Sequence, residues 1–287
     1  MRIPQGGIAF FDSGIGGLTV MNACFQYFHN GIFYYYGDNS RAPYGNLSKE
    51  TIYRYTYEAF ETFAKLKVQA AVIACNTVTA LCIDKLRAEF PFPIIGTEPC
   101  VLTAAKGGGK VFVLSTRATY ESNRFNELCA RARECYPNAE ILPFACDGLA
   151  GEIERRLLCE NYDFSSFFPK GTPTSVVLGC THYAYVKSQM EKFYGCPVFD
   201  GGDGVARRLV SEIEKIQKNK LENGQKGDFL RKTEFFRPLE TTVNVCSGDF
   251  RENRPKLPQN PPFLQLFWLG SGKTVNKSIN KQMFGYV

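Results

Sequence analysis

The sequence AFFDSGIGGLTV at residues 9–20 places an apolar run before an Asp-Ser pair and then puts three glycines within four positions. An apolar run followed by a glycine-rich turn and a helix-like stretch is typical of the strand–turn–helix units of α/β proteins. The turn does not match the phosphate-binding motifs, because the third glycine of G-x-G-x-x-G is replaced by Thr19 and no Lys-Ser or Lys-Thr pair follows. A carboxylate at Asp12 would also repel a pyrophosphate. The stretch therefore favours an α/β fold whose turn either closes over something smaller or serves packing alone.

Short apolar runs alternate with longer amphipathic stretches along most of the chain. The runs GIFYYYGD at 31–38 and AAVIACNT at 70–77 are expected to be strands, and residues 47–67 are expected to be a helix with Ser48 as a possible N-cap. Strands separated by helices imply βαβ units. We therefore predict an α/β protein of two similar domains, with mostly parallel sheets flanked by helices.

Polar residues follow several of the predicted strands. In open parallel sheets, ligands bind just beyond the carboxyl ends of the strands, so these residues are candidates for a site. The group is unusually polar and includes two thiols: Asp12-Ser13, Gly37-Asp38, Cys75-Asn76-Thr77, Thr97-Glu98 and Cys180-Thr181-His182.

The composition is that of a globular protein, with 44% hydrophobic and 22% charged residues over 287 positions. No apolar stretch is long enough to span a membrane, and the N-terminal residues do not have the pattern of a signal peptide, so we expect a cytoplasmic protein. The eleven cysteines are an odd number and none has C-x-x-C spacing. This pattern argues against both a disulfide framework and a structural zinc site.

The net charge of +6 is unevenly distributed along the chain. From Arg207 onward there are 15 Lys and Arg against 8 Asp and Glu, whereas the preceding residues hold 19 against 20. Because the basic part has no dense Lys/Arg run, we interpret it as solvated surface and expect no nucleic-acid partner. Residues 218–262 combine scattered charges with a proline-rich stretch, which predicts a long excursion or linker.

Two segments, AVIACNTVTA and SVVLGCTHYA, share an apolar run followed by a small residue, a cysteine and two hydrogen-bonding residues. The two cysteines, Cys75 and Cys180, are 105 positions apart, each well inside its own half of the chain. If the two units face one another, the thiols lie on opposite sides of one cleft.

Three kinds of chemistry would use such a pair of thiols. A disulfide fits the geometry, but a reducing cytosol argues against it. A Cys-His nucleophile is a second option, although the chain has only two histidines, His29 and His182, and the partner histidine of such hydrolases is normally distant in sequence from the cysteine. Proton exchange at a stereocentre is the third, since inversion needs one acid-base group on each face of the carbon and a thiol ionises not far above neutrality, at about pH 8.5.

For the third option, neighbouring residues would complete the site. Asp12 and His182 could orient the thiols and pass protons. The remaining strand-end side chains, together with amides at helix N-termini, suit the amino and carboxylate groups of a small acid; they are Ser13, Asn76, Thr77 and Thr181.

Five blocks of sequence carry a resemblance to a known family: FDSGIGGLTV, YGDNSRAPYGNLS, ACNTVTA, GTEP and LGCTHY, in this order. The chain resembles, over about residues 6–210, the glutamate racemase family, within the cofactor-independent aspartate/glutamate racemase superfamily. The resemblance implies interconversion of L- and D-glutamate without pyridoxal phosphate or metal, supplying D-glutamate for peptidoglycan.

The resemblance also implies roles for individual residues. Cys75 and Cys180 match the two catalytic acid-base residues, which Asp12 and His182 assist. Glu154 is the candidate for an auxiliary carboxylate. The implied substrate contacts are Asp12, Ser13, Tyr44, Gly45, Asn76, Thr77, Thr119, Thr181 and His182.

In its domain organisation, the family pattern implies a first domain of residues 1–97 and 208–287 and a second of 98–207, with the active site between them and commonly a homodimer. The C-terminal part departs from the pattern in residues 218–241, in the stretch RPKLPQNPP and in the tail. Two alternatives stay open at this point: a racemase of aspartate or another amino acid, and a non-catalytic binding protein of the same fold.

Overall fold

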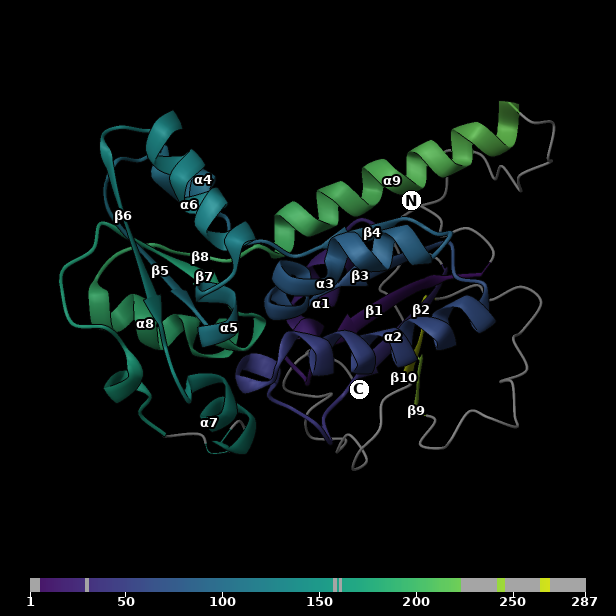
Figure 1. Ribbon diagram of the computed structural model, residues 1–287, viewed down its shortest axis with the longest axis horizontal. Helices are drawn as coiled ribbons and strands as arrows, with labels where there is room; N and C mark the ends of the chain where they lie inside the picture. The colour runs from purple at the N-terminus through teal and green to yellow at the C-terminus, as the bar shows by residue number, and fades with distance from the viewer. Residues whose placement is uncertain are drawn as a thin grey trace.

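The computed structural model of the chain describes residues 6–28, 31–156, 159 and 162–222, together with the backbone of residues 242–245 and 264–268. These residues form two lobes, each built around its own sheet (Figure 1). The first sheet has the order β4-β3-β1-β2-β10-β9 and comprises β1 Ile8–Asp12, β2 Gly31–Gly37, β3 Ala70–Ile73, β4 Ile94–Gly96, β9 Thr242–Val245 and β10 Leu264–Trp268. The second has the order β6-β5-β7-β8 and comprises β5 Gly109–Ser115, β6 Ala139–Ala145, β7 Ser175–Gly179 and β8 Val198–Phe199.

Helices connect the strands and cover the sheets. The α-helices of the described part are α1 Gly17–Phe25, α2 Lys49–Leu66, α3 Asn76–Glu89, α4 Val101–Ala105, α5 Arg117–Tyr120, α6 Asn123–Cys135, α7 Leu149–Arg156, α8 Lys187–Tyr194 and α9 Gly202–Glu222. Three short 3-10 turns lie between them: η1 Tyr44–Asn46, η2 Ser165–Phe167 and η3 Thr181–Val186. The N-cap predicted for the helix after residue 47 is confirmed, since the Ser48 side chain accepts a hydrogen bond from the Thr51 amide at the start of α2.

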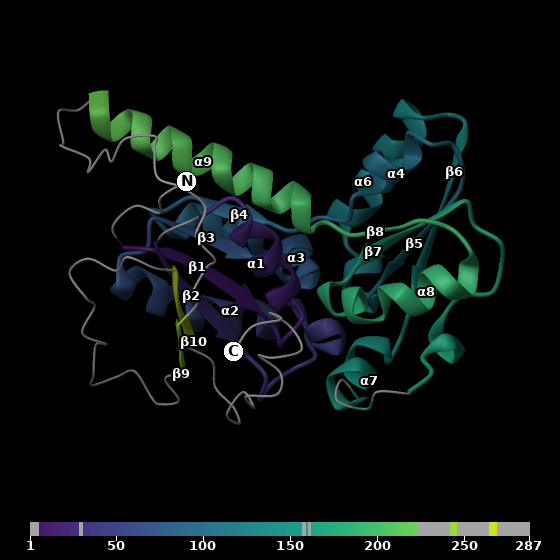
Figure 2. The ribbon, with the colours of Figure 1, turned by 180° about the vertical axis from the view of Figure 1, so that it is seen from behind.

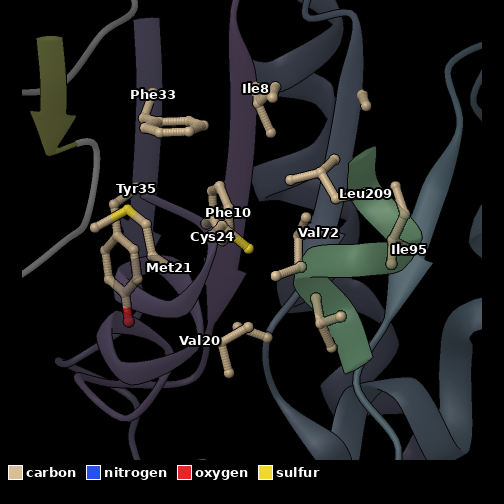
Figure 3. Packing of buried hydrophobic residues seen from close by; sticks show 14 of the residues in the cluster. Ile8, Phe10, Val20, Met21, Cys24, Phe33, Tyr35, Val72, Ile95 and Leu209 are labelled. Carbon is tan, nitrogen blue, oxygen red and sulfur yellow. The ribbon is translucent and has the colours of Figure 1, made fainter. Parts of the chain in front are cut away.

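Strand β1 of the first sheet is buried on both faces, since its side chains point alternately to the two faces and helices pack against each. Ile8 and Phe10 of β1 pack with residues of α1 and α9, including Met21 and Leu209 (Figure 3). The next residue along the strand, Phe11, packs with α2 and α3 on the other face. Burying one such large side chain stabilises the fold by about 1.5–3 kcal/mol, which explains why the strand sequence is continuously apolar.

The second sheet is also covered on both sides. Phe112 and Leu114 of β5 pack with α7, η3 and α8, whereas Val111 and Val113 pack with α4 and α6. The two lobes are joined near the start of α9, which runs along the first lobe (Figure 2). There the Cys100 thiol lies 3.3 Å from the backbone oxygen of Asp200, so the segment that enters the second lobe after β4 contacts the segment that leaves it after β8.

The predicted α/β architecture is confirmed, and every strand pairing in the described part is parallel. The division into residues 1–97 with 208–287 and residues 98–207 stays a prediction. Two details were wrong: the strand expected at residues 70–77 ends at Ile73, with α3 beginning at Asn76, and residues 218–222 of the expected excursion are the last turn of α9. The rest of the excursion, apart from β9, and the C-terminal tail lie outside the described residues.

Within the part of the chain that the structure describes, no helix is both long and apolar enough to cross a membrane.

Candidate active site

The turn at the end of β1 supplies the first element of the site. Asp12 is the last residue of the strand and is fully buried, and its carboxylate accepts hydrogen bonds from the Gly14 amide at 2.9 Å and from the Thr181 hydroxyl at 3.2 Å. Thr181 follows β7, so this contact joins the carboxyl ends of strands from the two sheets. Burial raises the pKa of Asp12, and His182 and the Gly14 amide offset this only in part.

Cys75 occupies the N-cap position of α3, two residues beyond β3. Its Sγ lies 3.6 Å from the Ser13 hydroxyl, and the residue is only 5% exposed. Burial and the negative charge of Asp12 raise its pKa to about 11, and a charge on Cys180 acts in the same direction. The two thiols are therefore close enough to influence each other electrostatically.

Cys180 follows β7 directly and is 8% exposed. Its Sγ lies 3.9 Å from Nδ1 of His182, and Nε2 of the same ring lies 2.6 Å from Oε1 of Glu154. Because a carboxylate only accepts hydrogen bonds, Nε2 carries a proton and Nδ1 faces the thiol. Burial opposes a charge on His182, but the hydrogen bonds to Cys180 and Glu154 raise its pKa well above 6.5.

Glu154 comes from α7 in the second lobe and reaches the glycine turn of the first. The carboxylate oxygen that meets His182 also accepts a hydrogen bond from the Ile15 amide at 3.0 Å. Burial favours a higher pKa for Glu154, but the hydrogen bond and charge of His182 lower the pKa below 4.5. The residue named from the resemblance as the auxiliary carboxylate is thus in contact with His182.

Three threonines meet where α3 of the first lobe faces α5 of the second. The Thr77 hydroxyl lies 3.0 Å from that of Thr116 and 3.3 Å from that of Thr119. Thr77 and Thr119 were predicted site residues, whereas Thr116 was missed. Thr116 comes directly after the last residue of β5, in the same way that Ser13 comes after the last residue of β1. Applying the strand-end rule to β5 would therefore have identified Thr116.

The other predicted residues occupy the same region with different partners. Tyr44 begins η1, and its hydroxyl donates to the buried carboxylate of Asp38. A Cβ on Gly45 would lie 3.1 Å from Cβ of Thr116, so η1 touches the second lobe there. The Asn76 side chain donates to the Thr97 backbone oxygen at 3.1 Å.

Two tyrosines that are absent from the predicted site residues hold the glycine turn, the buried Tyr35 and the half-buried Tyr185. The Tyr35 hydroxyl donates to the Gly14 oxygen at 2.9 Å, and the Tyr185 hydroxyl, from η3, donates to the Ile15 oxygen at 2.8 Å. Aromatic residues in apolar runs are normally core residues, so no sequence signal separates these two from their neighbours.

Cys75 and Cys180 are both buried. Neither residue lines the cavity of about 740 Å³ that opens between α2, α3 and α6, whose lining includes Cys82. Among the described residues, no group of three or more His, Cys, Asp or Glu side chains is arranged to hold a metal ion. The chemical groups that the site offers are therefore two thiols, a histidine, carboxylates and hydroxyls.

Each of the two parallel sheets has a buried thiol just beyond the end of one strand, Cys75 after β3 and Cys180 after β7. The family model for Asp/Glu/Hydantoin racemase matches residues 19–159. The chain is 35% identical over 232 residues to a glutamate racemase of Clostridium kluyveri, a match that covers 76% of this chain and 89% of that protein. A glutamate racemase of Clostridium novyi is 35% identical over 236 residues, covering 78% of this chain and 89% of that protein. The chain belongs to the glutamate racemase family.

The fold agrees with this assignment. The crystal structure of a glutamate racemase from Bacillus anthracis superposes with a TM-score of 0.68 at 22% identity, covering 99% of this chain and 95% of that chain.

Replacing Glu154 with Gln is expected to lower the midpoint of thermal unfolding by about 2–8 °C, since a charged hydrogen bond of about 1–2 kcal/mol is weakened. The contribution of Glu154 is complete above its ordinary pKa of 4.5 and is lost as the pH falls through its lowered folded-state value. The contribution of His182 to the stability of the folded protein is complete below pH 6.5 and is lost as the pH rises through the raised folded-state pKa of His182. The difference in unfolding midpoint between Glu154→Gln and the unmodified protein should therefore be largest between pH 4.5 and pH 6.5.

Thermal melts at a series of pH values measure this difference. Asp147→Asn is the control, because Asp147 pairs with Arg117 at an exposed position where an ion pair contributes little. A Glu154→Gln effect that does not change with pH would contradict the assignment of the ion pair.

Proposed function

We propose that the protein interconverts L- and D-glutamate by a two-base proton transfer, with Cys75 serving one face of the α-carbon and Cys180 the other. Membership of the glutamate racemase family supports the substrate. The arrangement of the thiols supports the mechanism: each follows a strand of a different sheet, and each contacts a polar partner, Ser13 or His182.

The reaction needs only proton transfers. One cysteine, as the thiolate, takes the α-proton, so that the C–H bond breaks as an S–H bond forms and the electron pair is delocalised toward the carboxylate of the substrate. The other cysteine, as the thiol, delivers its proton to the opposite face and becomes the thiolate. In this proposal no metal or organic cofactor takes part.

Asp12 and His182 assist the two thiols. His182 faces the Cys180 thiol through Nδ1 and is held by Glu154, so it can accept or return a proton without changing its orientation. The negative charge of Asp12 raises the pKa of Cys75, whereas the ammonium group of a bound amino acid would oppose this effect and favour the thiolate. A positively charged substrate therefore suits this site.

The substrate is bound by side chains and backbone groups around the thiols. We assign this role to Asp12, Ser13, Tyr44, Gly45, Asn76, Thr77, Thr119, Thr181 and His182. Because Tyr44 uses its hydroxyl on Asp38, its contribution would come from the backbone. Access requires the Thr77–Thr116 and Asp12–Thr181 contacts between the lobes to separate, since both thiols are buried.

Family membership supports three further proposals. The protein acts in the cytoplasm, it supplies D-glutamate for peptidoglycan synthesis, and it forms a homodimer, which light scattering of the purified protein would test. We expect no nucleic-acid or membrane partner.

Initial rates with L-Glu, D-Glu, L-Asp and D-Asp, followed by circular dichroism, test the substrate. We expect glutamate to be favoured in kcat/KM by about 10- to 200-fold, the range that one methylene group supports. The doubly substituted Cys75→Ser/Cys180→Ser protein gives the background rate. Turnover of aspartate with none of either glutamate would overturn the proposed substrate, and full activity of the double variant would overturn the mechanism.

A further inference from the structure

A fully buried carboxylate lies beside the site without a role in the mechanism above. This carboxylate belongs to Asp38, which directly follows β2 and whose backbone amide donates a hydrogen bond to the backbone oxygen of Asp12 at 3.1 Å. A buried carboxylate is costly unless a cation and hydrogen-bond donors compensate it.

Arg41 supplies the cation. Its Nε lies 2.6 Å from Oδ2 of Asp38, and another guanidinium nitrogen lies 2.8 Å from the Glu58 carboxylate. The guanidinium also stacks on the ring of Tyr55, 3.9 Å from its centroid. A planar group held by two carboxylates and a ring has a well-defined orientation, which a lysine cannot reproduce in full.

The same carboxylate oxygen, Oδ2 of Asp38, accepts the hydrogen bond from Tyr44. Tyr44 is the first residue of η1 and is nearly fully buried. The next residue, Gly45, lies so close to Thr116 of the second lobe that a Cβ would be 3.1 Å from the threonine Cβ. The position of Asp38 therefore determines where the Tyr44–Gly45 backbone meets the opposite lobe.

We propose that Arg41 is a positioning residue for substrate binding: by holding Asp38, it places the Tyr44–Gly45 backbone against Thr116, where the substrate binds. This inference rests on the proposed function, because it takes the Tyr44–Gly45 segment as part of the glutamate site. Arg41 itself does not contact the thiols or take part in proton transfer.

Arg41→Ala is expected to raise KM for both enantiomers of glutamate about tenfold while changing kcat less than about threefold. The reason is that the Tyr44–Gly45 segment binds substrate and transition state alike, and loss of such uniform binding appears in KM. Arg41→Lys should recover part of this loss, since it restores the charge but not the fork of donors. Arg54→Ala is the matched control, because Arg54 lies 5.1 Å from the centroid of the same Tyr55 ring, and we expect unchanged kinetics.

A second experiment separates positioning through Asp38 from a general loss of structure. In an Asp38→Asn background the buried charge is gone, so adding Arg41→Ala should change KM less than about twofold. The same background keeps the test valid if Arg41→Ala alone does not fold, because the double variant has no uncompensated carboxylate.

The outcomes distinguish this proposal from the function on which it rests. If the unmodified protein does not racemise glutamate, the proposed function fails. If it does, but Arg41→Ala leaves KM within twofold, lowers only kcat, or raises KM equally in the Asp38→Asn background, then the positioning role alone is overturned.

Discussion

Cys75→Ser and Cys180→Ser should each lower the rate of glutamate racemisation by about 10³-fold or more in both directions. A positioned acid-base group contributes about 10²–10⁴-fold, and inversion needs one on each face, so neither thiol can substitute for the other. A serine hydroxyl has nearly the same shape but is far less acidic than a thiol. Racemisation followed by circular dichroism from each enantiomer measures the loss.

The control for this experiment is Cys82→Ser. Cys82 is buried within α3, the helix that Cys75 caps, and belongs to the same hydrophobic cluster, but it has no part in the proposed proton transfer. Below its unfolding temperature this variant should retain activity, although it will be less stable. Comparable losses in all three variants would mean that the cysteines act through packing rather than chemistry.

The two single variants should also differ from each other. An analogue with chloride on its β-carbon can eliminate chloride once one base removes the α-proton, so elimination needs only one thiol. Each variant should therefore eliminate from one enantiomer, with opposite preferences. Identical preferences would contradict the assignment of one cysteine to each face.

Gly16→Ala should reduce kcat/KM by about 10²-fold while leaving the first lobe folded. A Cβ at this position would lie 2.5 Å from the Thr181 hydroxyl, 2.7 Å from Nδ1 of His182 and 2.8 Å from the His182 amide. The backbone of Gly16 is in the ordinary right-handed region, so the effect is steric rather than conformational. Because a displacement of about 1 Å can cost about 10²-fold in rate, separating the turn from η3 should disable the site.

Gly204→Ala is the matched control for the steric argument. A Cβ there meets nothing within 4 Å, and alanine within α9 should stabilise the helix by about 0.5–1 kcal/mol. Wild-type kinetics in Gly16→Ala would show that the glycine turn and His182 do not need to approach this closely during the reaction.

The sequence predicted the lobes and the thiols because their signals are local. An apolar run such as residues 70–74, followed by Cys75 and a helix, is specified by its own side chains, and the strand-end rule then places Cys75 near Asp12. The two parallel sheets with flanking helices confirm the fold class that these local signals predicted. The roles of the individual residues are still predictions.

Contacts that depend on tertiary structure could not be predicted in the same way. The link from Glu154 to both Ile15 and His182 joins three segments that have no common pattern in the sequence, and Glu154 was named only from the resemblance. Tyr185 and Arg41 look like ordinary core and surface residues. Their contacts with Ile15 and Asp38 exist only once the strands are assembled.

The most direct test of the two-thiol mechanism is deuterium transfer from solvent to the α-carbon of glutamate by purified, chelator-treated protein. With either enantiomer in D₂O, we expect the product to carry deuterium at the α-carbon from the first turnovers, because the delivering thiol has exchanged with solvent, while unreacted substrate stays largely protiated. A product that retains the original hydrogen at the α-carbon, or a product without deuterium from both enantiomers, would contradict this mechanism.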